Sequence, residues 1–206
     1  MRLADNGINQ VLVNSPALEK YIRENYPSYK IISSTTKRIT DKNKLLEEFD
    51  KDYALVVLDY DLNHDEEALE RIVSSGNAGR CEILVNEVCY PNCPKRAEHY
   101  AQQSKCQLEF DTSVSYPCLV SNAPRNFEEC MKRPAFIKDT DISSYIERGF
   151  RHFKIAGRGM PESYTIDSYV YFLVKPEYRN LVRNKIETSI RDLKNQAAAG
   201  AAKRRL

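Results

Sequence analysis

The sequence predicts an α/β protein with a parallel sheet, and three observations lead to this prediction. Short apolar runs that suit strands alternate with segments whose apolar residues recur at helical spacing. Several of these helical segments follow Ser, Thr, Asp or Asn, which cap helix N-termini. The chain of 206 residues, 42% of them hydrophobic, is long enough for one core. Strand–helix alternation implies right-handed βαβ units, so we expect parallel strands in a doubly wound sheet or in part of a barrel.

The expected elements follow from these patterns in order. The predicted strands are residues 11–13, 30–34, 54–59, 82–86 and 152–156. The predicted helices are residues 17–25, a segment around 45–49, a segment around 69–73, and residues 95–103, 143–148 and 176–194. The strand at 54–59 is almost continuously apolar, which is typical of a strand covered on both faces. Ser15, Asp41 and Asp65 stand where helix caps are expected, and Gly149 stands where a helix should end.

The second half of the chain is less regular. Residues 104–134 show no clear periodicity, and so long an irregular stretch usually has a function. The last helix has one apolar stripe and should pack on the sheet; the stripe consists of Leu181, Val182, Ile186, Ile190 and Leu193. We expect one barrel-like domain over residues 1–195 and a disordered tail over 196–206.

Charge and hydropathy exclude several classes of protein. Lys and Arg (31) nearly balance Asp and Glu (29), so overall charge does not favour nucleic acid. No apolar run reaches the roughly 18 residues of a membrane span, and the first residues lack a signal peptide's apolar stretch. We therefore expect a cytoplasmic protein with no membrane association. In that compartment its six cysteines would be reduced.

The cysteines are the main functional signal, because all six lie between Cys81 and Cys130. Cys89 and Cys93 directly follow the predicted strand at 82–86, at the sheet edge where parallel α/β folds place their sites. Pro91 and Pro94 stiffen this loop, which reduces the entropy lost on holding two thiolates at one centre. These features predict an iron–sulfur or other metal site.

The remaining ligands have alternatives. Cys118 and Cys130 can complete four thiolates for a 4Fe–4S cluster, with Cys106 as a substitute for either. A zinc ion bound by Cys89, Cys93, His99 and Cys106 is the second interpretation, because tetrahedral zinc accepts sulfur and nitrogen ligands together. Simple core thiols are the third. Cys81, at a strand start, is expected in the core.

Further candidate residues follow the other predicted strands. Lys154 and Arg158 flank the turn at Gly157 and can bind a carboxylate or phosphate, or can form structural salt bridges with Asp59 or Glu87.

Three polar residues end predicted strands, where they line a pocket or make hydrogen bonds at the edge of the core. They are Ser34, Asp59 and Asn86. Lys95, Arg96 and His99 lie near Tyr90 and Tyr100, a mixture that suits either single-stranded nucleic acid or a solvated helix face. His64 and His152 have no visible nucleophile beside them, so triad hydrolysis has little support.

Similarity to a known family is found in residues 7–18, 32–35, 56–63, 82–94 and 153–158, and so covers roughly Gly7 to Tyr178. Together these segments resemble the collagenase-like peptidase family U-32. The resemblance implies a (β/α) TIM-type barrel, a four-iron cluster held by cysteines, and either hydroxylation of RNA bases or ubiquinone precursors or, by the family's historical label, proteolysis. Ala156 departs from the family's Lys-Ile-Glu-Gly-Arg motif, where a glutamate is usual.

Three functions follow from the resemblance. The first is an iron–sulfur protein that assists modification of a nucleobase or small aromatic substrate; the second is a peptidase. The third is a non-catalytic subunit that completes a barrel as a homo- or hetero-oligomer. About five strands are predicted where a barrel needs eight, so we expect a partial barrel that lacks N-terminal strands.

Overall fold

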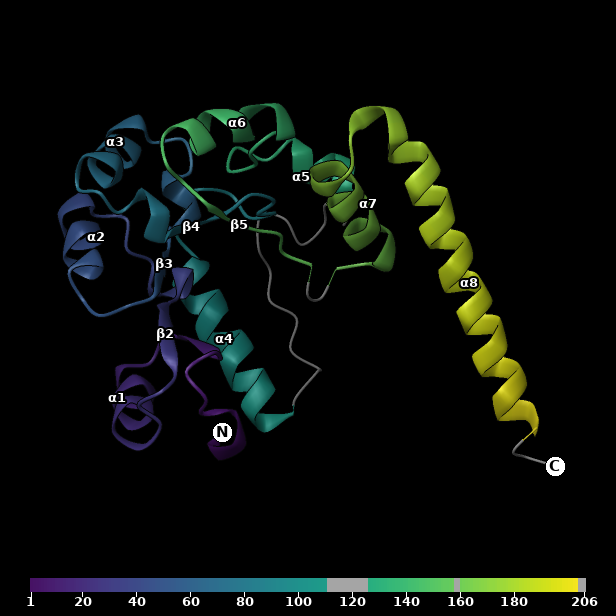
Figure 1. The fold of residues 1–206 in the computed structure, drawn as a ribbon, viewed down its shortest axis with the longest axis horizontal. Helices are drawn as coiled ribbons and strands as arrows, with labels where there is room; N and C mark the ends of the chain where they lie inside the picture. The colour runs from purple at the N-terminus through teal and green to yellow at the C-terminus, as the bar shows by residue number, and fades with distance from the viewer. Residues whose placement is uncertain (111–125, 158–159, 204–206) are drawn as a thin grey trace. The chain divides into compact units, whose positions relative to one another are not determined.

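The computed structural model describes residues 1–110, 126–157 and 160–203, and a five-stranded parallel sheet forms its centre (Figure 1). The strands are β1 (Gln10–Val13), β2 (Lys30–Ser33), β3 (Leu55–Val57), β4 (Cys81–Leu84) and β5 (His152–Lys154). They are neighbours in chain order, β1 to β5, and every pair is parallel. All five strands expected from the sequence are confirmed, as is the α/β class.

The register of the sheet brings the carboxyl ends of the strands to one edge. Val13 lies opposite Ser33, Ser33 opposite Val56, and Leu84 opposite Lys154. The residues that immediately follow the strands therefore share this edge, which we call the carboxyl edge. It is the edge at which parallel α/β proteins usually place their ligands.

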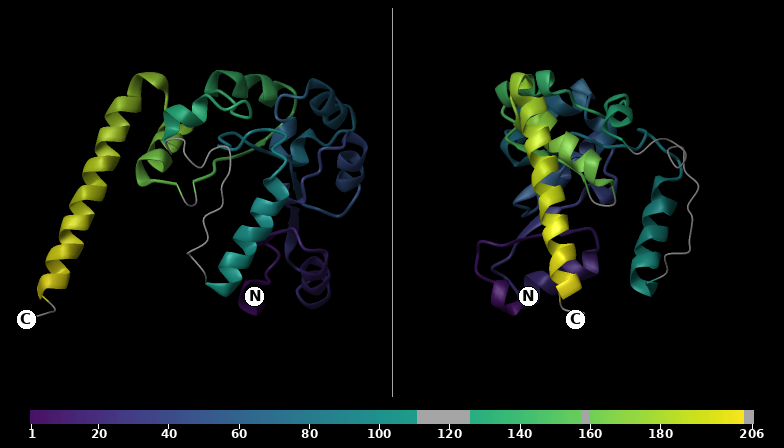
Figure 2. Two further views of the ribbon diagram at one scale, coloured as in Figure 1. Left: turned by 180° about the vertical axis from the view of Figure 1, so that it is seen from behind. Right: turned by 90° about the vertical axis from the view of Figure 1, so that its right-hand side faces the viewer.

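Helices connect consecutive strands. The α-helices are α1 (Pro16–Asn25), α2 (Lys42–Phe49), α3 (Glu66–Ser74), α4 (Arg96–Glu109), α5 (Phe127–Met131), α6 (Asp139–Glu147), α7 (Glu162–Leu173) and α8 (Arg179–Lys203). Short 3-10 helices occur at η1 (Arg2–Ala4), η2 (Thr35–Lys37), η3 (Tyr60–Leu62), η4 (Ala78–Arg80) and η5 (Pro176–Tyr178). Helices α2 and α3 lie on one side of the strands and α4 on the other (Figure 1); Figure 2 shows the same ribbon from behind and from the side.

Capping residues mark the starts of three helices, and a glycine marks the end of another. The side chains of Ser15, Asp41 and Asp65 accept hydrogen bonds from backbone N–H groups in the first turns of α1, α2 and α3, as predicted. The start of α6 was predicted wrongly, since it begins at Asp139 rather than residue 143. Gly149 has a φ of 100°, a conformation that favours glycine, so the predicted helix stop is confirmed.

The core lies mainly between the sheet and its flanking helices. Ile31 of β2, Leu45 and Phe49 of α2, and Leu69 and Ile72 of α3 are each at most 2% exposed. A second cluster joins Ile32, Leu55 and Val57, whose side chains alternate with those of their strand neighbours. Strands β2 and β3 therefore bury both faces, as the apolar run at 54–59 predicted for β3.

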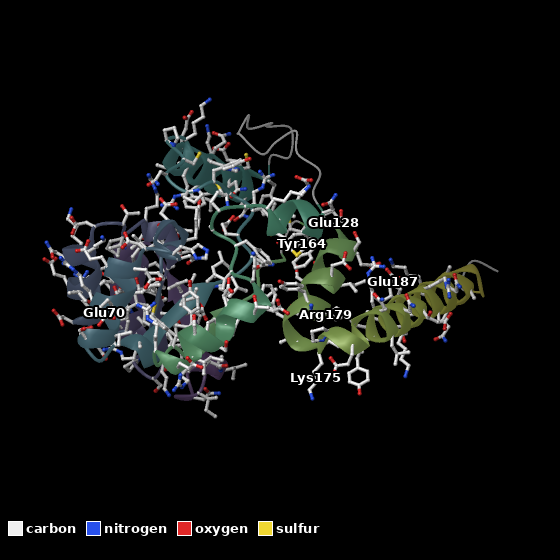
Figure 3. The ribbon with its side chains drawn as sticks, turned by 90° about the horizontal axis from the view of Figure 1, so that it is seen from above. Glu70, Glu128, Tyr164, Lys175, Arg179 and Glu187 are labelled. Carbon is white, nitrogen blue, oxygen red and sulfur yellow. The ribbon has the colours of Figure 1, made fainter. Side chains whose placement is uncertain are left out.

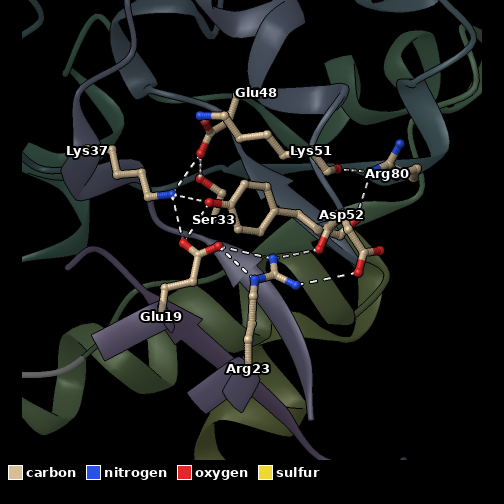
Figure 4. A network of polar contacts seen from close by, with 9 residues as sticks. Glu19, Arg23, Ser33, Lys37, Glu48, Lys51, Asp52 and Arg80 are labelled. Carbon is tan, nitrogen blue, oxygen red and sulfur yellow. Dashed lines mark hydrogen bonds and ion pairs between the residues drawn. The ribbon is translucent and has the colours of Figure 1, made fainter. Parts of the chain in front are cut away.

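A buried ionic network centred on Glu48 joins α2 to β2 (Figure 4). The Glu48 carboxylate accepts hydrogen bonds from Ser33 Oγ at 2.6 Å and from Lys37 Nζ at 2.7 Å, and pairs with Lys51. Burial opposes ionisation of this carboxyl, but the hydrogen bonds from Lys37, Lys51 and Ser33 outweigh burial and hold its pKa at about 2, below the ordinary 4.5. Glu48 therefore stays charged inside the fold.

We expect Glu48 to make the fold sensitive to acid. Its pKa is lower in the folded chain than in the unfolded chain, so its contribution is complete above pH 4.5 and is lost as pH falls toward 2. Glu48→Gln should remove about 2 kcal/mol of the pH dependence of the unfolding free energy across this window. Urea titrations at several pH values would measure it. Glu24→Gln, at an exposed carboxylate, is the control; equal pH slopes for wild type and Glu48→Gln would refute the assignment.

The described residues form two compact units. The first contains the sheet and takes residues 1–110 and 129–156; the second takes residues 126–128, 157 and 160–203. In the second unit the Phe127 ring lies 5.2 Å from that of Tyr171 and 6.0 Å from that of Tyr164. Arg179 stacks on Tyr171 at 4.6 Å, and Figure 3 labels Tyr164 and Arg179 in this unit.

Helix α8 packs on α7 and η5 within the second unit. It continues to Lys203, so residues 196–203 are helical, and 204–206 lie outside the described part. The single domain expected over residues 1–195 stays a prediction. Helix α7 was not predicted. Among the described residues, no helix is both long enough and apolar enough to cross a membrane.

Candidate functional site

The loop that carries Cys89 and Cys93 follows β4 at the carboxyl edge, as predicted. Cys89 is half-buried and packs against a cluster that contains Tyr60 and Leu84, while Cys93 is 8% exposed. Asn92, between the two cysteines, has a φ of 56°. Asparagine adopts this left-handed conformation more readily than most residues, so the loop can turn sharply just before Cys93.

Cys130, predicted as a further ligand, reaches the same region from α5. Its thiol donates a hydrogen bond to the carbonyl of Asn86 at 3.3 Å, with the carbonyl of Glu87 at 4.0 Å. Arg133, just after α5, hydrogen-bonds to the hydroxyl of Tyr90 and stacks on its ring at 4.8 Å. The structure therefore brings a cysteine 41 residues further along the chain to the base of the Cys89 loop.

A buried ion pair lies beside this loop. Arg96, at the start of α4, is 2% exposed, and its guanidinium forms two hydrogen bonds to the Asp59 carboxylate at 2.7 and 2.9 Å. A third hydrogen bond reaches Asp61 at 3.2 Å, and the guanidinium stacks on Tyr60 at 4.4 Å. This bidentate geometry is specific to arginine. Asp59 is thus bound within the protein, which fits the predicted edge hydrogen bonding.

The surroundings of Cys89 favour its protonated form. Burial raises the pKa of the Cys89 thiol and is the largest cause; the nearby Tyr60 hydroxyl lowers it, and Glu87 and Cys93 raise it by smaller amounts. Burial also raises the pKa of Glu87, although its carboxylate accepts a hydrogen bond from the Cys89 N–H at 2.9 Å. The Tyr60 hydroxyl is buried and has no hydrogen-bond partner among the described residues. A metal ion would shift this balance, because bound thiols lose their protons.

Asn86 joins the ends of β4 and β5. It is fully buried, and its amide donates to the Ala156 carbonyl at 2.8 Å and accepts from the Ala156 N–H at 2.7 Å. The N–H and the carbonyl of Ala156, two residues after β5, are therefore both satisfied by one side chain. This is the edge hydrogen bonding that the sequence predicted as one role for Asn86.

Two other predicted binding residues, Ser34 and Lys154, each contact a different partner within the protein. Ser34 is 4% exposed and caps η2, since its Oγ accepts from the Thr36 N–H at 3.2 Å. Lys154 pairs with Glu82 at 3.4 Å, rather than with the Asp59 or Glu87 of the salt-bridge alternative. The structure therefore places Ser34 and Lys154 at the carboxyl edge but gives each a protein partner. Arg158 and Cys118 lie outside the described residues.

Two of the four residues of the zinc alternative, His99 and Cys106, lie on α4. Cys106 lies ten residues beyond Arg96, which corresponds to about 15 Å along a helix. Its thiol accepts a hydrogen bond from Gln102 at 3.6 Å. Within the described ranges, no three side chains of His, Cys, Asp or Glu come together as a metal site. Cys81 is fully buried at the start of β4, as predicted for a core thiol.

Sequence reasoning missed the role of Arg96. It was grouped with Lys95 and His99 as a nucleic-acid contact or a solvated face, yet its side chain is buried. A possible signal was the pair Asp59 and Asp61 directly after a buried strand, since two carboxylates there need a cation. Nothing in the sequence shows which basic side chain pairs with these two carboxylates.

Comparisons with known proteins give no further assignment. No family model matches the chain, and neither a curated protein nor a solved structure matches it.

Proposed function

We propose that this chain is a U-32 peptidase-like protein with a 4Fe–4S cluster held by Cys89, Cys93, Cys118 and Cys130. Its sheet would form part of a (β/α) barrel, for which the consecutive parallel order of β1 to β5 is the supporting feature, because doubly wound sheets reverse their strand order. The cluster would assist a hydroxylation-type modification of a nucleobase or small aromatic substrate. When bound, such a cluster supplies one-electron transfer or structural support.

The approach of Cys130 to the base of the loop that carries Cys89 and Cys93 is the observation that supports this proposal; among the described residues the three thiols do not by themselves form a metal site. Cys89 and Cys93 lie on one loop, and the Cys130 thiol is 3.3 Å from the carbonyl of Asn86 at the base of that loop. Thiolates are the usual ligands of iron–sulfur clusters, so the donor set fits in kind. Cys106 is less suitable than Cys130 as a further ligand. It lies about 15 Å along the helix from the start of α4.

Anion binding near the cluster belongs to the same proposal. Lys154 is 37% exposed and Arg158 follows four residues later, and together they would bind a carboxylate or phosphate of the substrate. To bind the ligand, the Lys154 ammonium would have to leave Glu82, or contact Glu82 and the ligand at the same time. Ser34, Asp59 and Asn86 then act by shaping the carboxyl edge through the contacts described above.

A second candidate function is a subunit that completes a barrel with a homologous or different partner. Among the described residues, β1 and β5 each pair on one side, so both sheet edges are open. Exposed apolar side chains lie on and beside β1, at Leu12, Leu18 and Tyr21. The peptidase alternative has less support, since the His64 ring hydrogen-bonds to the Phe136 carbonyl at 3.0 Å and lies near Tyr145.

The metal content of cysteine variants tests the first proposal. Protein purified without oxygen should lose its iron and sulfide almost completely in Cys89→Ala/Cys93→Ala, and largely in Cys130→Ala. Cys81→Ala is the matched control, because it removes a buried thiol from the start of β4 and should keep the cluster. Zinc that disappears in His99→Ala and Cys106→Ala would support the zinc alternative instead. A chain that binds no metal but self-associates would favour the barrel-completing subunit.

A further inference from the structure

Arg96 contacts the cysteine loop through its backbone as well as its side chain. Its N–H donates a hydrogen bond to the carbonyl of Cys93 at 3.2 Å. The backbone contact ties the start of α4 to the second cysteine, and the guanidinium ties the same residue to the segment after β3. Arg96 therefore connects Cys93 to the end of a neighbouring strand.

The groups that surround the Arg96 side chain lie beside the loop. Asp61 accepts a hydrogen bond from the guanidinium of Arg96 at 3.2 Å. Tyr60, on which the guanidinium stacks, packs in the same cluster as Cys89. The arginine thus contacts the loop through the Cys93 carbonyl and through the Tyr60 ring beside Cys89.

Burial and geometry show that this arrangement is specific. The side chains of Arg96, Asp59 and Asp61 are 2%, 1% and 7% exposed, so these charges depend on each other rather than on water. A lysine would keep the positive charge but would lose both the bidentate contact and the flat stacking surface. The position therefore requires the shape of arginine, beyond its charge.

We propose that Arg96 is a positioning residue for the metal site, and that it sets the separation and exposure of Cys89 and Cys93. The inference rests on the proposed function, because it assigns Arg96 a part in the same site. Residues that orient metal ligands commonly affect metal affinity by 10- to 100-fold when they are changed.

Two readouts on Arg96→Lys test this role. The first is the rate at which iodoacetamide alkylates Cys89 and Cys93, measured by mass spectrometry relative to Cys106 in the same molecule. The second is Co²⁺ affinity, followed by thiolate-to-cobalt absorption. We expect alkylation of the loop cysteines to rise at least about tenfold and Co²⁺ affinity to fall about 10- to 100-fold. The double variant Asp59→Asn/Arg96→Gln removes both charges and should show the same changes.

Arg80→Lys is the matched control. Arg80 also makes several hydrogen bonds, to the carbonyls of Phe49, Lys51 and Tyr53, but it lies before β4 rather than after it. Its variant should leave both readouts unchanged even if it lowers the melting temperature. The positioning role would be overturned if Arg96→Lys had the same alkylation rate and Co²⁺ affinity as the wild type. It would also be overturned if Arg80→Lys changed both readouts as much as Arg96→Lys does. Absence of Co²⁺ binding by the wild type would overturn the metal site, whereas the alkylation ratio would still decide whether Arg96 orders the loop.

Discussion

Replacing Asp59 by alanine is expected to destabilise the protein by about 3–5 kcal/mol. The Arg96 guanidinium would remain buried, with Asp61 as its remaining carboxylate contact at 3.2 Å. An incompletely paired buried charge is costly, and domains of this size have a total stability of about 5–15 kcal/mol. Urea unfolding followed by circular dichroism would measure the change.

An exposed ion pair provides the comparison for Asp59. Arg148 contacts Glu66 at 2.9 Å, but the Glu66 side chain is 79% exposed, so Glu66→Ala should cost less than about 1 kcal/mol. If the two variants lost similar stability, the Asp59–Arg96 pair would not be buried as described. The triple variant Asp59→Asn/Asp61→Asn/Arg96→Gln should recover part of the loss, because it removes the guanidinium together with both carboxylates that pair with it.

Replacing Asn86 by alanine is expected to cost about 2–4 kcal/mol. The substitution removes two hydrogen bonds and leaves the N–H and carbonyl of Ala156 without the amide that satisfies them. It should also loosen the ends of β4 and β5, so backbone amides near Ala156 should exchange hydrogen faster.

Asn25→Ala is the control for Asn86, because Asn25 is exposed and makes one hydrogen bond, to the Tyr21 carbonyl. Its cost should stay below about 0.5 kcal/mol. An Asn86 variant as stable as the Asn25 variant, with unchanged exchange near Ala156, would contradict the bridging role of Asn86.

The strands of the sheet were predicted well because each corresponds to a short apolar run that can be recognised from neighbouring residues alone. Short apolar runs gave the five strands, and Ser15, Asp41 and Asp65 cap the helices that follow them. Helix α7 was missed because Glu162–Leu173 is rich in β-branched and aromatic residues, which favour strands. Packing among aromatic rings, such as those of Phe127 and Tyr171, accompanies its helical form and is invisible to a local pattern.

The candidate site was predictable in location but not in its contacts. Strand position placed Cys89, Cys93 and Asn86 at the carboxyl edge, where the structure has them. The approach of Cys130 and the burial of Arg96 against Asp59 depend on residues 44 and 37 positions apart, so neither could be inferred from spacing. These long-range contacts hold the loop that carries Cys89 and Cys93 in place, and they pair the buried charges beside it.

The iron, acid-labile sulfide and zinc content of the wild-type chain, purified without oxygen, tests the central claim most directly. We predict about four iron and four sulfide per chain, with absorbance near about 400 nm. Zinc at one equivalent without sulfide would contradict the cluster and support the zinc alternative. Neither iron nor zinc above background would contradict the claim that Cys89 and Cys93 bind a metal.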